Sequence, residues 1–208
     1  MIKRSTDISI LRLVLRDLLE TLRETGDFQC VAIRLPREGD FPYFVQMGFP
    51  ELFVSEEGSL NVRDKEGNLV LDSDGTPFVE CMCGNVLRRR TNPKHPYFTE
   101  DGAFWTNSTI RLLNDLTEKE RQEIGRTRNT CHDFGYESVA LIPIHADGEI
   151  LGLIQINDPR EGLFTLEKIE EYQSLADHLG RVTVNILKFY EKANQVVNLA
   201  SELRNVEE

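Results

Sequence analysis

Three cysteines in two distant segments are the residues of this chain best suited to chemistry. Cys81 and Cys83 form a Cys-x-Cys pair, and Cys131 stands next to His132 much further along. On an extended strand the two sulfurs of Cys-x-Cys would lie on one side, about 7 Å apart, and in a turn they would come closer. Thiolates favour soft metals, so Cys81, Cys83 and Cys131 are candidate ligands for zinc, copper(I), an iron–sulfur cluster or haem iron, with His132 as a further ligand.

Two other roles for these cysteines remain open. Cysteine is among the most commonly buried residues, so all three could be inert core side chains. They could instead be redox thiols, or form a disulfide. Cys30, the fourth cysteine, lies within an apolar stretch and is interpreted as a core residue. The sequence has no Gly-rich phosphate loop, Gly-x-Ser-x-Gly elbow or His-Glu-x-x-His motif, so common catalytic classes find no support.

An aromatic segment followed by short polar residues is a second candidate site. Binding pockets are mostly apolar with a few polar anchors, and this combination occurs between residues 104 and 109. We therefore predict that a ligand pocket is lined by Phe104, Trp105, Asn107 and Thr109. The alternative is that the two aromatic rings only cap the core.

A hairpin over residues 136–158 must position these groups. Alternating apolar residues lead to a tight turn at Asp147-Gly148, and the returning arm is almost wholly apolar. An arm of this kind belongs at the centre of an antiparallel sheet that helices cover on at least one face. The pattern also predicts a helix that ends at Gly26, strands over 28–35 and 41–47, and a flap over 48–79.

The last helix, which follows Thr165, has two apolar patterns. Its first half carries enough apolar residues to cover the sheet. Its second half narrows to a seam with polar flanks, formed by Ile186, Phe189, Ala193, Val196, Ala200 and Leu203. An apolar seam that extends beyond the globular core needs a partner helix. We therefore predict a homodimer formed through the N- and C-terminal helices.

Composition excludes several classes of partner. The chain has 208 residues and a net charge of −11, which argues against nucleic acid and an anionic membrane surface. The N-terminal apolar run is broken by Arg12, Arg16 and Asp17, so it predicts neither a signal peptide nor a membrane anchor. Cysteines without an export signal point to reduced thiols and a cytoplasmic location.

The order helix, hairpin, irregular insertion, hairpin, long helix resembles the GAF domain. The segment GYESVALIPIHADGEILGLIQINDPREGLFTLEKIEEYQSLADHLG is similar to that family's closing hairpin and helix. The segments ECMCGNVLRRRTNP, GAFWTNST and RTRNTCHDFGYESVAL resemble a subgroup that accompanies PAS domains and sensor histidine kinases. A related archaeal group attaches haem through a cysteine. Where relatives often have a further cysteine, this chain has Asn61.

The resemblance implies an α+β fold of GAF/PAS type. Its central antiparallel sheet would have the N- and C-terminal helices packed on one face, with a long C-terminal dimerisation helix. We predict an N-terminal lead-in (1–10), a GAF sensory domain (11–187) that includes the flap, and a helical extension (188–208). The family implies a cytoplasmic domain that binds a small-molecule ligand, metal or haem and signals to a histidine kinase or other output domain. The alternatives are a free methionine sulfoxide reductase-like enzyme and a ligand-free dimerisation module.

Overall fold

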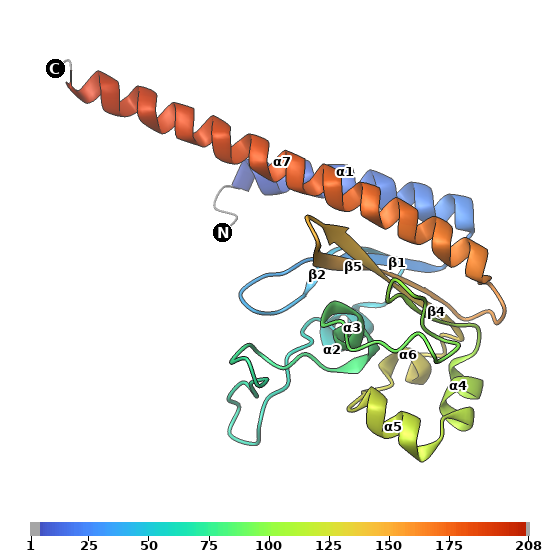
Figure 1. Cartoon of the computed structure of the whole chain (residues 1–208). Coiled ribbons are helices and arrows are strands. Elements are labelled where there is room, and N and C mark those ends of the chain that lie inside the picture. Colours follow the sequence, from blue (N-terminus) through green and yellow to red (C-terminus); the bar gives the residue numbers. More distant parts are fainter. Residues whose placement is uncertain (1–4, 207–208) are drawn as a thin grey trace.

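The centre of the protein is a five-stranded antiparallel sheet. The computed structural model describes the backbone of residues 5–206 and the side chains of residues 9–189 and 192. The strands follow the order β2-β1-β5-β4-β3 across the sheet (Figure 1). They are β1 (Cys30–Arg34), β2 (Tyr43–Met47), β3 (Phe104–Thr106), β4 (Ser138–Ala146) and β5 (Glu149–Asp158). The predicted α+β fold with a central antiparallel sheet is confirmed.

The hairpin of β4 and β5 forms the middle of the sheet, as the sequence predicts. The two strands pair in a register that sets Ile142 opposite Ile154. Asp147 and Gly148 both have positive φ, 52° and 84°, which is the conformation of a tight hairpin turn. β5 is paired on both sides, with β4 and with β1, and this explains its apolar composition.

Two helices cover one face of the sheet, α1 (Ser5–Gly26) and α7 (Leu166–Val206). Figure 1 shows them side by side across the strands. The prediction that the N- and C-terminal helices pack on one face is therefore confirmed. α7 approaches β4 closely at Gly180, where an added Cβ would lie 2.0 Å from the carbonyl oxygen of His145. The core between them contains Leu11, Leu15, Leu19, Ile33, Ile142, Ile144, Ile154, Ile169 and Ala176.

Short helices and their connecting loops cover the opposite face (Figure 1). A second core lies between them and the sheet, centred on a cluster of aromatic rings that includes Phe49, Phe53 and Tyr136. Cys30 belongs to this core, with its Sγ 3.3 Å from the hydroxyl of Tyr136. The helices are α2 (Glu51–Glu56), α3 (Cys81–Leu87), α4 (Thr109–Asp115), α5 (Glu118–Ile124) and α6 (Thr130–Asp133).

Both cysteine segments are helical rather than extended. Cys81 and Cys83 lie in the first turn of α3, where residues two apart point in different directions. Cys81 has φ +65°, so the chain turns sharply as it enters this helix. Cys131 and His132 lie in the short helix α6. A contact distant in sequence holds the start of α3, because the backbone N–H of Cys81 donates to the carbonyl oxygen of Arg126.

The 48–79 segment and the far end of α7 complete the chain. The segment contains α2 and then isolated β-bridges, among them Asn61 with Val79 and Arg63 with Leu69. α7 continues as one helix to Val206. Within residues 5–206, no helix has the length and apolar character required to cross a membrane. The predicted seam residues Ala193, Val196, Ala200 and Leu203 lie outside the described side chains.

Candidate functional site

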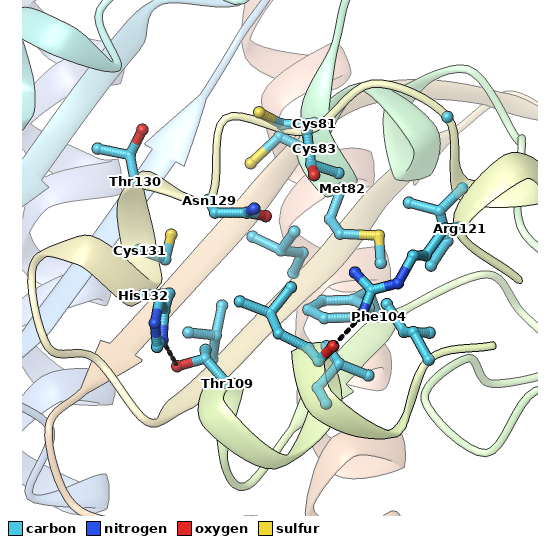
Figure 2. Close-up of a pocket in the computed structure, with 18 of the residues that line it drawn as sticks. Cys81, Met82, Cys83, Phe104, Thr109, Arg121, Asn129, Thr130, Cys131 and His132 are labelled. Carbon is cyan, nitrogen blue, oxygen red and sulfur yellow. Dashed lines mark hydrogen bonds between the residues drawn. The ribbon is translucent and has the colours of Figure 1, made fainter. Parts of the chain in front are cut away.

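A cavity of about 170 Å³ lies between the sheet and helices α3 to α6, and we call it the thiol cavity. β3 and β4 form its floor, where Phe104, Val139 and Leu141 face the cavity. Figure 2 shows its lining side chains converging from the sheet and from the helices. Most of the wall is apolar, with Met82, Leu112, Leu113, Leu116 and Ile124 contributed by the helices.

All three candidate cysteines line this cavity. Cys81 and Cys83 come from the first turn of α3, and Cys131 comes from α6. Figure 2 shows the sulfur of Cys131 on the side of the cavity toward α3. The fold thus brings two segments that are distant in sequence to one wall.

Burial keeps these thiols protonated. Removal from water raises the pKa of Cys81, of Cys83 and of Cys131 to about 12 in each case. At Cys81 the backbone N–H of Arg128 opposes this effect, because it donates a hydrogen bond to Sγ at 3.1 Å. The carboxylate of Glu57 raises the pKa of all three thiols further. The cavity therefore presents neutral, weakly nucleophilic thiols at neutral pH.

His132 lines the same cavity and is oriented by Thr109. The hydroxyl of Thr109 donates to the carbonyl oxygen of Tyr136 at 2.8 Å. The same hydroxyl lies 3.2 Å from Nδ1 of His132, shown as a dashed line in Figure 2. Because the hydroxyl hydrogen is already engaged, Nδ1–H of a neutral His132 is the donor, and Nε2 retains a free lone pair.

An ion-pair network closes the cavity at the loop of residues 125–129. Glu80 is 4% exposed and pairs with Arg126 at 2.6 Å and with Arg128. Arg128 also approaches Glu57, with its Nη1 3.7 Å from Oε1. That Oε1 is buried and accepts no hydrogen bond within the described residues. Glu57 in turn lies 3.9 Å from the fully buried guanidinium of Arg34.

Glu57 and Arg121 are cavity residues that sequence reasoning missed. Glu57 follows α2 in the segment interpreted as a flap, so nothing in its surroundings marked it as buried. Arg121 lies in a helix that is polar on nearly every side, which is typical of a solvent-exposed surface. Neither belongs to a motif with a characteristic spacing, and only the fold brings them to the thiols.

The four predicted pocket residues are divided between two hollows. Phe104 and Thr109 line the thiol cavity. Trp105 and Asn107 line a separate groove of about 640 Å³ at the sheet edge. Adjacent residues of β3 point to opposite faces, which separates Phe104 from Trp105. The side chain of Asn107 is held by the backbone of Phe164, with which it makes two hydrogen bonds of 2.8 Å.

The arrangement gives no support to a resident metal or haem. Among the side chains that the structure describes, no group of three or more His, Cys, Asp and Glu residues is arranged to hold a metal ion. A cavity of about 150 Å³ accommodates benzene. The thiol cavity is close to that volume, whereas a haem is far larger than benzene. Asn61 does not line the cavity. The metal and haem ligands proposed from the sequence stay predictions.

Comparisons with known proteins agree on one family. The family model of the GAF domain matches residues 11–182. A comparison with curated proteins found no match. Among solved structures, a type II free methionine-R-sulfoxide reductase from Thermoplasma acidophilum is similar, with 12% identity, a TM-score of 0.53, and 86% of this chain and 96% of that chain covered.

Two further solved structures are similar to this chain. The blue-light absorbing form of the PixJ GAF domain from Thermosynechococcus elongatus has 11% identity and a TM-score of 0.55, with 96% of this chain and 98% of that chain covered. A domain of a protein named as a two-component sensor histidine kinase in Sinorhizobium meliloti 1021 has 11% identity and a TM-score of 0.54, with 86% and 94% covered. At these identities the likeness shows the fold alone. The family model covers most of the chain, and the protein therefore belongs to the GAF domain family, whose members are in general ligand-binding domains of signalling and regulatory proteins.

Proposed function

We propose that this chain is a sensory GAF domain that binds a small, mostly apolar molecule in the thiol cavity. The cavity carries the proposal, because it is about 170 Å³ in volume, is lined mainly by apolar side chains, and contains neutral thiols. Apolar cavities of about this volume bind apolar molecules such as benzene. Three thiols and His132 add weak polar contacts that select among ligands of similar size.

The size of the cavity limits the ligand. A volume of about 170 Å³ is close to the roughly 150 Å³ that accommodates benzene. It is below the roughly 300–1,000 Å³ of pockets for drug-sized molecules. The ligand is therefore comparable to one substituted benzene ring.

Strand β4 connects the cavity with the helix pair. Val139 and Leu141 face the thiol cavity, whereas the alternate residues Ile142 and Ile144 pack in the core beneath α1 and α7. A ligand that displaces β4 by a fraction of an ångström changes the packing of α7 on the opposite face. Packed interfaces respond to such displacements by switching between discrete arrangements. Binding is thus converted into a movement of the terminal helices.

The terminal helices provide a surface for a second copy of the chain. Large apolar side chains are exposed on them, with Leu13 at 57% and Val182 at 47%. Exposed apolar residues on both terminal helices support an interaction surface there. We infer that the protein acts as a cytoplasmic homodimer and passes its state to an output such as a histidine kinase.

Binding of toluene tests the cavity directly. Titration of the whole chain, followed by ¹H–¹⁵N spectra, is expected to shift amides of β4, α3 and α6. Leu113→Trp, at a half-buried wall position, narrows the cavity and abolishes these shifts. Leu52→Trp is the matched control, because Leu52 is 63% exposed on α2. If toluene does not bind, the sensor proposal fails and a ligand-free dimerisation module becomes the better description.

A redox enzyme is the second candidate. Three thiols around one cavity could reduce a sulfoxide such as free methionine sulfoxide, the substrate of one protein that shares the fold. Two thiols would lose two protons and two electrons to form a disulfide, the sulfoxide oxygen would leave as water, and a thioredoxin dithiol would reduce the disulfide again. The raised thiol pKa values oppose this candidate, because the thiolate is the reacting form.

Turnover distinguishes the two candidates. The chain is incubated with free methionine-R-sulfoxide, thioredoxin, thioredoxin reductase and NADPH, and NADPH consumption is measured. The sensor proposal predicts no consumption above that of the Cys131→Ser variant. Consumption by the unaltered chain that Cys131→Ser abolishes would establish the enzyme.

A further inference from the structure

Arg121 lies at the wall of the thiol cavity and carries the inference. It belongs to the last turn of α5, and its guanidinium donates a hydrogen bond to the carbonyl oxygen of Leu113. Figure 2 shows this side chain extending into the cavity from the side opposite to Cys131, with the hydrogen bond as a dashed line. A guanidinium has five N–H donors, so several remain for another acceptor.

The pairing of Arg121 differs from that of the other arginines around the cavity. Arg34 lies 3.9 Å from Glu57, and Arg126 lies 2.6 Å from Glu80. Among the side chains that the structure describes, none of the ion pairs involves Arg121. The chain has 35 acidic and 24 basic residues, so a cation without a carboxylate partner is conspicuous at this site.

The charges of the cavity are separated. Glu57 raises the pKa values of the cysteines, which places its carboxylate at the thiol end, and Arg34 and Arg128 offset its charge there. At the other end Arg121 stands among apolar side chains, those of Leu112, Leu113, Leu116 and Ile124. A ligand would therefore meet an apolar wall and then one positive charge at the cavity mouth.

We propose that the ligand of the thiol cavity is a small organic monocarboxylate whose apolar body fills the cavity and whose carboxylate pairs with Arg121. The proposal rests on the sensory function above and adds the chemical class of the ligand. The planar guanidinium matches a carboxylate geometrically and can donate two parallel hydrogen bonds.

Three probes of nearly equal size test the charge preference. Toluene measures apolar binding alone, benzoate adds the carboxylate, and benzamide replaces that carboxylate by a neutral group. Dissociation constants are measured by calorimetry at constant ionic strength. Benzoate is expected to bind about fivefold more tightly than benzamide, the upper value for an exposed ion pair, and added salt reduces this difference.

Variants test whether the preference for benzoate over benzamide depends on Arg121. Arg121→Gln keeps an amide donor for the carbonyl oxygen of Leu113 but removes the charge, and it is expected to abolish the preference while leaving toluene binding unchanged. Arg111→Gln is the matched control, because Arg111 lines the separate edge groove and pairs with Glu161. Thermal unfolding verifies that both variants fold. Benzylamine tests the unaltered chain without any substitution, and this cation is expected to bind more weakly than toluene.

The outcomes separate this inference from the sensory function. Toluene binding without a benzoate preference, or a preference that persists in Arg121→Gln, overturns the carboxylate assignment and leaves the cavity function intact. Benzylamine binding more tightly than benzoate overturns it as well, even if the Arg121→Gln variant does not fold. Failure of all probes to bind overturns the sensory function together with the inference.

Discussion

The backbone N–H of Arg128 donates a hydrogen bond to Sγ of Cys81 at 3.1 Å, and the backbone N–H of Cys81 donates to the carbonyl oxygen of Arg126 at the same distance. Cys81 thus binds two residues of the 125–129 loop, one through its side chain and one through its backbone. Its φ of +65° is uncommon for a residue with a side chain and costs of the order of 1 kcal/mol. A change at Cys81 therefore alters the loop that borders the thiol cavity.

Removal of the Arg128 side chain is expected to destabilise the protein. Arg128→Leu leaves the buried carboxylates of Glu80 and Glu57 without this cation, which costs about 3 kcal/mol of unfolding free energy. Urea unfolding measures the loss. The control is Arg111→Leu, which breaks an exposed ion pair with Glu161 and changes stability by less than about 1 kcal/mol. Equal effects of the two substitutions would contradict the buried network.

The cavity thiols are expected to react slowly with iodoacetamide in the folded protein. A pKa raised from 9.0 to about 12 keeps the proton on Cys81, Cys83 and Cys131, so the thiolate fraction at pH 8 falls about a thousandfold. The reaction rate should rise with pH throughout the range up to about 12. Mass spectrometry of alkylated peptides measures each site, and the guanidinium-unfolded chain gives the reference rate. Reaction of Cys81 in the folded chain at that reference rate contradicts the prediction.

The contact of α7 with β4 predicts that Gly180→Ala is destabilising. Alanine favours helices over glycine by about 1 kcal/mol, but its Cβ would lie 2.0 Å from the carbonyl oxygen of His145. Moving the helix away from β4 costs more than the gain, and we expect a net loss of about 2 kcal/mol. Thermal unfolding compares this variant with Ser174→Ala, an exposed position of the same helix. A stabilised Gly180→Ala protein would show that α7 packs less closely.

Charges on the outer surface of the helix pair are expected to produce monomers. The double substitution Leu13→Glu and Val182→Glu replaces exposed apolar side chains of α1 and α7 by carboxylates. Sedimentation velocity is expected to show a dimer for the unaltered chain and a monomer for the variant. Leu52→Glu makes the same change on α2, beneath the opposite sheet face, and should leave the dimer intact. A monomeric unaltered chain at high micromolar concentration contradicts the homodimer.

Strong periodicity made the central sheet and the terminal helices predictable. The alternation in residues 136–158 and the turn at Asp147-Gly148 specify the β4–β5 hairpin without information from the rest of the chain. The structure also has a Thr117–Glu120 capping box at the start of α5, a local signal of the same kind. Local patterns of this kind are sufficient to predict an element when hydrophobic burial and local backbone preference favour the same structure.

The second face of the sheet was less predictable. Helix α3 begins at a cysteine with positive φ, a conformation that long-range hydrogen bonds impose and no local pattern indicates. The alternation of β3 could have separated Phe104 from Trp105, but a three-residue strand gives too short a pattern. Glu57 and Arg121 reach the thiol cavity only through the packing of α2 and α5, so their roles follow from the fold rather than from spacing.

Because α7 is long, a small movement where it contacts β4 is enlarged at its C-terminal end. Gly180 marks a close contact with the sheet, and packing against the core continues to Ile186 and Leu187, after which the helix runs on to Val206 beyond the strands (Figure 1). At a rise of 1.5 Å per residue, the stretch from Lys188 to Val206 is about 27 Å long. A rotation of the helix axis by about 5° where this stretch leaves the sheet would displace its far end by about 2 Å, by the same helix geometry. A small rotation of α7 on the sheet therefore becomes a larger displacement at its C-terminal end.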